Sequence, residues 1–160
     1  MLVDFSALPD TSRIWIYQSN RSFTAEEQKE IIAYLSSFLQ QWTAHGSDLH
    51  AGFEIKYNRF IIIGLDQSNA SASGCSIDAS VHFIQTLEQK YDVVLLDRMN
   101  VSFKQGEYIA YKPLKDFKKM AKDKAISKNT IVFNNLVASK LEYLENWEVP
   151  ASESWHARFV

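Results

Sequence analysis

The sequence predicts a single α+β domain with a ferredoxin-like (βαββαβ) core at residues 12–98, followed by a hairpin, two helices and a packed tail at residues 99–160. Apolar residues recur at three- and four-residue steps in two long segments, which is typical of amphipathic helices. Short runs rich in β-branched and aromatic residues lie around these segments, which is typical of strands. The order strand, helix, strand, strand, helix, strand is that of the split βαβ fold.

The first strand is expected at Arg13–Gln18. Thr24 and Glu27 have the spacing of a capping box, in which the Thr hydroxyl accepts from the third helical N–H and the Glu side chain reaches back. The helix that they begin should run to about Thr43, and Gly46 follows as an end signal. Its apolar stripe consists of Ile31, Leu35, Phe38, Leu39 and Trp42.

Two further strands are expected at Ala51–Tyr57 and Arg59–Asp66, joined by a tight turn. The second of them is apolar on both faces, which is typical of a central strand. A second helix should run from about Ser76 to Tyr91, with an apolar stripe of Ile77, Val81, Ile84, Leu87 and Tyr91. The apolar run Asp92–Asp97 should form the fourth strand. The right-handed crossover rule leads us to expect the first and third strands side by side and parallel.

The last third of the chain has weaker patterns. Val101–Phe103 and Glu107–Tyr111 should pair as a hairpin. A helix is expected from Pro113 to about Lys124, since proline is tolerated in a first turn, and another over Ile131–Trp147. The tail keeps two large aromatic residues, Trp155 and Phe159, which should pack back onto the domain or, if exposed, form a homodimer contact.

Composition limits the class of protein. The chain has 160 residues, a formal net charge of -2 and 46% hydrophobic residues, as expected of a soluble domain with no general attraction to nucleic acid or anionic lipid. Its longest strongly apolar run, Phe60–Ile63, is far shorter than the roughly 20 residues of a membrane helix. A single cysteine excludes an internal disulfide and a cysteine-rich zinc site. We therefore expect a cytoplasmic protein with no cofactor, no metal and no membrane partner.

The segment Ser68–Asp78, SNASASGCSID, is the best candidate for a site. A Gly-Cys-Ser turn at a helix start can present backbone N–H groups to an anion and favour a thiolate. In the predicted topology the turn Asn20–Ser22 lies beside this segment, and Arg21 of the turn adds a guanidinium group. The leading hypothesis is a soluble domain that binds a small ligand or anion, or a protein partner, at a pocket formed by the Ser68–Ser76 loop. The predicted ligand-binding residues are Asn20, Arg21, Ser73, Gly74, Cys75 and Ser76. The plainer interpretation is a capping turn with a small buried cysteine.

A second hypothesis makes Cys75 the nucleophile of a small enzyme. His82 would lie on the same helical face but about 10 Å away along the axis, too far for a thiol–imidazole pair. A phosphatase-type loop would need an arginine where Val81 stands. Neither a phosphate-binding P-loop nor a dinucleotide-binding glycine motif is present, so the chain is not expected to be a P-loop ATPase.

Other clusters of polar residues carry weaker hypotheses. His45, Asp48 and His50 form a loop cluster that can be read as a metal site, although loop spacing alone is weak evidence. Asp66 and Asp97 follow predicted strands, where turn or capping roles are the commoner interpretation.

The segment Lys112–Lys128 is locally basic, with seven lysines against Asp116 and Asp123. It can be read as a site for RNA or for an acidic partner. A solvated helix face is the plainer interpretation, because the aromatic strand motif of ferredoxin-like RNA-binding domains is absent.

The motif SGCSID with the following VHFI, and the ending NWEVP with SWHARF, resemble a family of short uncharacterised Bacteroidetes proteins. Some members carry the label "ABC transporter ATPase". The resemblance implies a bacterial protein and brings no established activity. The label does not fit this chain, because the glycine loop and lysine that cradle the phosphates of ATP are missing.

Overall fold

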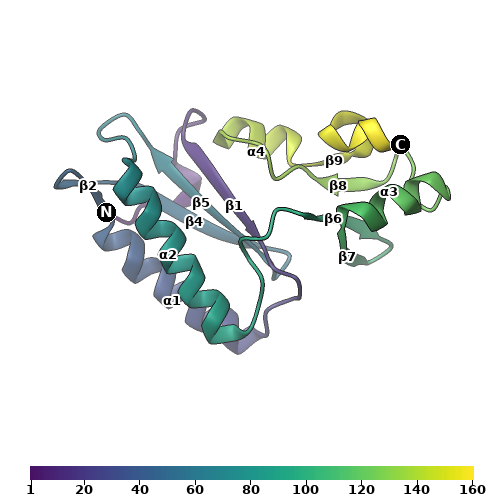
Figure 1. The fold of residues 1–160 in the computed structure, drawn as a ribbon. Helices are drawn as coiled ribbons and strands as arrows, with labels where there is room; N and C mark the ends of the chain where they lie inside the picture. The colour runs from purple at the N-terminus through teal and green to yellow at the C-terminus, as the bar shows by residue number, and fades with distance from the viewer. The chain divides into compact units, whose positions relative to one another are not determined.

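The computed structural model describes all 160 residues, which form a mixed α+β protein of two compact units. Unit 1 contains Met1–Leu96 and Ala138–Leu141, and unit 2 contains Asp97–Val137 and Glu142–Val160. Each unit has its own sheet (Figure 1), and each has its own apolar core. Neither has a helix with the length and apolar character needed to cross a bilayer.

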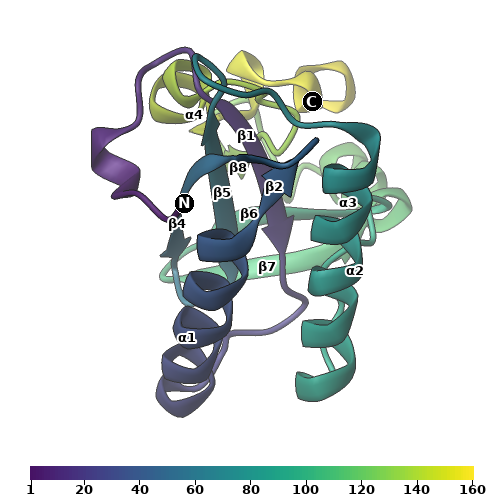
Figure 2. The same cartoon turned by 90° about the vertical axis from the view of Figure 1, so that its left-hand side faces the viewer.

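Unit 1 is a three-stranded antiparallel sheet with two long helices on one face (Figure 2). The strand order is β1-β5-β4. The elements are the 3₁₀ turn η1 (Phe5–Ala7), β1 (Arg13–Gln18), α1 (Ala25–Gln41), the short hairpin β2 (Thr43–Ala44) and β3 (Ser47–Asp48), β4 (His50–Lys56), β5 (Phe60–Asp66) and α2 (Gly74–Tyr91). The predicted capping box of α1 is confirmed, with Thr24 accepting from the Glu27 N–H and Glu27 accepting from the Thr24 N–H.

The expectation that the first and third strands are parallel is wrong. β1 and β5 are adjacent but antiparallel, with Gln18 opposite Phe60 and Arg13 opposite Leu65. The crossover through α1 connects β1 to β4, and β5 returns between them through a tight turn at Tyr57 and Asn58, both with positive φ. The C-terminal ends of β1 and β5 therefore lie at opposite ends of the sheet.

The predicted fourth strand, Asp92–Asp97, is also absent. Its N–H groups bond to side chains instead of to a neighbouring strand: Glu88 Oε2 accepts from Leu95 and Leu96 at 2.7 and 3.0 Å, and Asn20 Oδ1 accepts from Val94 at 2.9 Å. The apolar side chains Val93 and Leu95 are buried in the core all the same. The apolar run therefore indicates that this segment is buried, and the hydrogen bonds to Glu88 and Asn20 determine its backbone conformation.

The core of unit 1 lies between the sheet and the two helices. Ile61, Ile63 and Leu65 of β5 point into it, because alternate residues of a strand share a face. Opposite them stand the stripe residues Ile31, Leu35 and Leu39 of α1 and Ile84 and Leu87 of α2. The apolar stripe of α1 is therefore confirmed as a core pattern, and that of α2 is confirmed for Ile84, Leu87 and Tyr91.

Unit 2 is a four-stranded antiparallel sheet in the order β7-β6-β8-β9. Its elements are β6 (Asn100–Gln105), β7 (Tyr108–Pro113), α3 (Leu114–Lys122), β8 (Ile131–Phe133), α4 (Lys140–Asn146, whose first two residues belong to unit 1), β9 (Glu148–Pro150), η2 (Ala151–Glu153) and η3 (Trp155–Phe159). The predicted hairpin and the helix after Pro113 are confirmed.

The helix expected over Ile131–Trp147 is wrong in its first half. Ile131–Phe133 is a strand, in which Val132 pairs with Phe103 of β6 and with Val149 of β9. Only Lys140–Asn146 is helical. The predicted packing of the tail is confirmed, since Trp155 and Phe159 lie half-buried against the core that contains Phe117.

Candidate binding groove between α1 and α2

The loop after β5 ends in a capping box made of two serines. Ser73 Oγ accepts from the Ser76 N–H at 3.1 Å, and Ser76 Oγ accepts from the Ser73 N–H at 2.7 Å. α2 therefore begins at Gly74, and the N–H groups of Gly74 and Cys75 have no acceptor within the chain, as is usual in a first helical turn. The first turn of α2 contains no acidic residue, unlike that of α1.

Cys75 is exposed and lies on the wall of a groove between α1 and α2. The groove has a volume of about 710 Å³. Four aromatic side chains line it: Tyr34, Phe38, Trp42 and Phe83. At the end next to Cys75, its lining is polar and includes Thr43, His45, Ser73 and Ser76.

Contacts between the two helices fix the walls of the groove. The rings of Phe38 and Phe83 stack with centroids 4.5 Å apart and an angle of 7° between their planes. Trp42 Nε1 donates to the Ser76 carbonyl at 2.8 Å and so joins the end of α1 to the first turn of α2. The buried indole also meets Trp15 of the sheet edge-on. The groove is therefore formed by packed side chains on regular elements.

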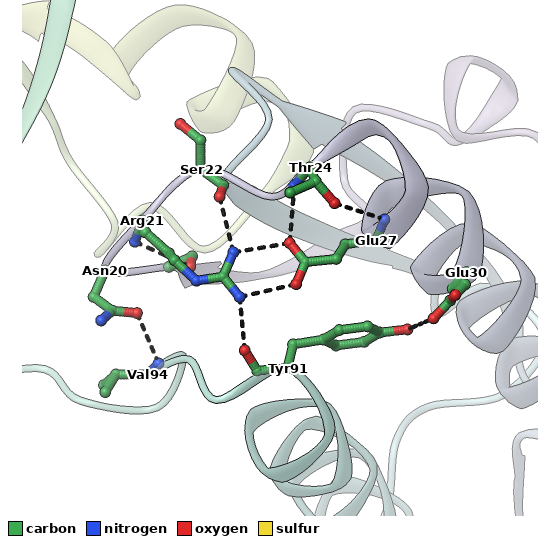
Figure 3. Close-up of polar contacts among 9 residues, drawn as sticks. Asn20, Arg21, Ser22, Thr24, Glu27, Glu30, Tyr91 and Val94 are labelled. Carbon is green, nitrogen blue, oxygen red and sulfur yellow. Dashed lines mark hydrogen bonds and ion pairs between the residues drawn. The ribbon is translucent and has the colours of Figure 1, made fainter.

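Asn20 and Arg21 do not lie beside Cys75, contrary to the expectation from sequence; Figure 3 shows the partners that they have instead. The guanidinium bonds to both carboxylate oxygens of Glu27 at 2.8 and 2.9 Å and donates to the Tyr91 carbonyl at 2.6 Å. Tyr91 ends α2, 16 residues after Cys75, so about 24 Å of helix separates the two residues. The antiparallel pairing of β1 and β5 is the reason, because it places their following turns at opposite ends of the helix layer.

The Arg21 cluster joins the start of α1 to the end of α2. Hydrogen bonding from Arg21 lowers the pKa of the Glu27 carboxyl to about 2, and the bond from the Thr24 N–H adds to the effect. The Tyr91 hydroxyl donates to Glu30 at 2.8 Å, and burial together with this carboxylate raises the pKa of the phenol. The Arg21 guanidinium, the Glu27 carboxylate and the Tyr91 hydroxyl all bond within the chain (Figure 3), so we assign the cluster a structural role.

Replacing Glu27 by glutamine is expected to lower the free energy of unfolding by about 1 kcal/mol at pH 7, since the Arg21 side chain is 40% exposed and solvent screens the pair. Because the folded pKa lies below the usual value, the difference from wild type should be complete above pH 4.5 and shrink as the pH falls towards 2. Urea titrations at several pH values measure it. Glu26→Gln, an exposed neighbour in the same turn, should change stability far less.

Among the remaining candidates from the sequence, His45 lines the groove, and the others lie apart from it or have partners within the chain. No group of His, Cys, Asp and Glu side chains is placed to hold a metal ion, which counts against the loop cluster at 45–50. Asp66 and Asp97 accept from backbone N–H groups two residues later, the turn role considered for them. No hydrogen bond joins the Cys75 thiol to an imidazole or a carboxylate, and His82 is exposed outside the groove.

The sequence-based reasoning did not find the aromatic lining of the groove. Phe38 and Trp42 were assigned to the buried stripe of the first helix, four residues apart and hence on one face. Phe83 lies outside the apolar stripe of the second helix, and this departure from the core pattern was the available signal. An aromatic residue beside a core stripe indicates a position between core and solvent, where a groove can form.

Comparisons of the chain with protein-family models, with curated proteins and with solved structures find no match. Any assignment of function to this protein therefore depends on its fold and on the groove.

Proposed function

We propose that unit 1 is a small-ligand-binding module whose site is the groove between α1 and α2 beside Cys75. The ligand class that fits is a flat apolar or aromatic group that carries an anionic substituent. The aromatic side chains would contact the flat part, and the start of α2 would meet the anion.

The observation that supports this proposal most strongly is the coincidence of two features in one place. The groove has aromatic walls, and it ends at a helix start with two unpaired N–H groups and no acidic side chain in its first turn. The partial positive charge of a helix N-terminus contributes about 0.3–1 kcal/mol to the binding of an anion at the surface. The aromatic contacts would supply most of the affinity.

The test uses anilinonaphthalene sulfonate, an aromatic sulfonate with this chemistry. We expect its fluorescence to rise on addition of the native protein and Ala79→Trp, which fills the groove from an exposed lining position, to weaken binding at least tenfold. Ala33→Trp places the same ring on an exposed part of α1 outside the lining and should bind as wild type. Equal binding by both variants would contradict the proposal.

Cys75 supplies a second readout of the same site. It is the only cysteine, so a maleimide can label only this thiol. Saturating sulfonate probe should slow labelling of the native protein severalfold, and labelled protein should no longer bind the probe. Labelling that is independent of the probe would place the probe elsewhere.

We also infer that unit 1 is a variant of the ferredoxin-like arrangement without the fourth strand. The order β1-β5-β4 with two helices on one face supports this inference, since three of the four strands of that arrangement have the same order and directions. A single exposed thiol suits a reducing, cytoplasmic environment, which we propose for the protein.

A further inference from the structure

Unit 2 has a concentration of positive charge that the groove does not use. The lysine segment, defined as residues 112–128, contains seven lysines, and every one of them is exposed. They are Lys112, Lys115, Lys118, Lys119, Lys122, Lys124 and Lys128. Only two acidic residues, Asp116 and Asp123, lie in the same segment.

These lysines have no ion-pair partners in the folded chain. The salt bridges that join Arg21 to Glu27 and Lys104 to Glu148 do not involve the lysine segment. Lys118 alone makes a notable contact, with its ammonium 4.9 Å from the centre of the Phe159 ring. The charge of the segment is therefore available to a partner.

The charges of the two units differ in sign. Unit 2 has ten Lys and Arg against eight Asp and Glu, whereas unit 1 has seven against eleven. The net charge of the whole chain is -2, and this sum hides the difference between the units. For that reason the net charge alone indicates no attraction to a polyanion. A basic surface on one part of a mildly acidic protein can still bind a polyanion locally.

The geometry of α3 arranges part of this charge in a row. Lys115, Lys119 and Lys122 are four and three residues apart, so they lie on one face of the helix at intervals of about one 5.4 Å turn. The opposite face of the helix packs against the core of unit 2, where Phe117 is fully buried and Leu114 contacts the same core. The helix thus presents a row of ammonium groups to solvent.

The neighbourhood of the row favours nucleic acid over other polyanions. A membrane-binding helix inserts its apolar face, and that of α3 is occupied by the core. A protein interface usually centres on exposed apolar or aromatic anchors. The exposed large apolar residues of unit 2 are Met99, Tyr108, Leu136 and Leu144. None of them belongs to α3, although the Met99 carbonyl accepts from the Leu114 N–H at the start of that helix. Phosphate contacts alone are enough for nucleic-acid binding without sequence preference.

We propose that the lysine segment binds the phosphate backbone of a nucleic acid, with the solvent-facing row of α3 at the centre of the contact. Binding releases counterions from the strand, so it should weaken steeply and linearly in a plot of log K against log salt concentration. The interaction does not depend on base sequence, and RNA and DNA share the phosphate chemistry.

The test measures fluorescence anisotropy of a labelled mixed-sequence single-stranded RNA with the full chain over a salt series, and repeats it with DNA of the same sequence. For Lys119→Gln/Lys122→Gln we expect affinity at low salt to fall about tenfold and the salt slope to become shallower by about one per lysine removed. The matched control, Lys29→Gln/Lys56→Gln, removes the same charge from exposed positions of unit 1 and should bind as wild type.

Three results would overturn the proposal. The first is equal weakening by both double variants, which would mean that only overall charge matters. The second is the absence of salt-dependent binding to either nucleic acid. The third is stronger binding to phosphatidylserine vesicles or to polyglutamate than to RNA and DNA at the same salt concentration, which would assign the surface to a membrane or to an acidic protein.

Discussion

Replacing Lys140 by methionine is expected to lower the free energy of unfolding of unit 1 by about 3 kcal/mol. The side chain is 7% exposed, and its ammonium donates to the carbonyls of Leu8 and Ser6 at 2.6 and 3.2 Å. Methionine keeps the apolar stem and removes the donor, so two carbonyl groups lose a charged partner. Hydrogen bonds to charged groups are among the stronger ones in folded proteins.

Urea unfolding followed by circular dichroism measures this effect, and Lys29→Met is the matched control because Lys29 is an exposed lysine of the same unit. Its substitution should change stability by less than about 0.5 kcal/mol. Amide exchange adds a local readout, since residues 4–12 should lose protection first when Lys140 is replaced. A Lys140→Met protein as stable as the control, or more stable than wild type, would contradict this account.

Lowering the pH from 6.5 to 4 is expected to destabilise unit 2 by up to about 3 kcal/mol through His156. The ring is fully buried, stacks on Trp155 and meets Phe117 edge-on. Ser154 Oγ lies 2.7 Å from Nδ1, and Nε2 has no partner. Burial alone lowers the pKa of the imidazole to about 4.

Stability falls at low pH because His156 takes up a proton more readily in the unfolded chain than in the folded chain. Above pH 6.5 the ring is neutral in both the folded and the unfolded chain, so the free energy of unfolding does not change through this group. Between 6.5 and 4 only the unfolded chain takes up the proton, and stability falls by about 1.4 kcal/mol per pH unit. Urea midpoints across this range measure the loss. His156→Gln should flatten the profile, whereas His82→Gln, at an exposed position, should leave it unchanged.

Patterns local to one segment were predicted well from the sequence. The capping box at Thr24 and Glu27, the stripes of α1 and α2 and the hairpin β6–β7 all depend on residues close together in the chain. For such patterns the residue types and their spacing are the physical cause, so the sequence contains the information directly.

The failures have a common cause in hydrogen-bond partners that lie outside the segment concerned. Asp92–Asp97 has the composition of a strand, yet Glu88 and Asn20 take its N–H groups. Ile131–Phe133 lies in a helical pattern of apolar residues but pairs with β6 and β9. In each case a partner outside the segment decides where the backbone hydrogen bonds go, and propensity alone cannot name that partner.

The candidate site shows the same division. By itself the sequence placed Cys75 at a helix start, offered a capping turn there as the plainer interpretation, and determined that the lysines of residues 112–128 outnumber the acids there. Only the tertiary structure decided that Arg21 bonds to Glu27 and Tyr91 at the far end of α2, and that aromatic side chains line a groove beside the thiol. The direction of β5 relative to β1 is the physical reason, since it determines which helix ends meet, and strand direction depends on pairing across the whole unit.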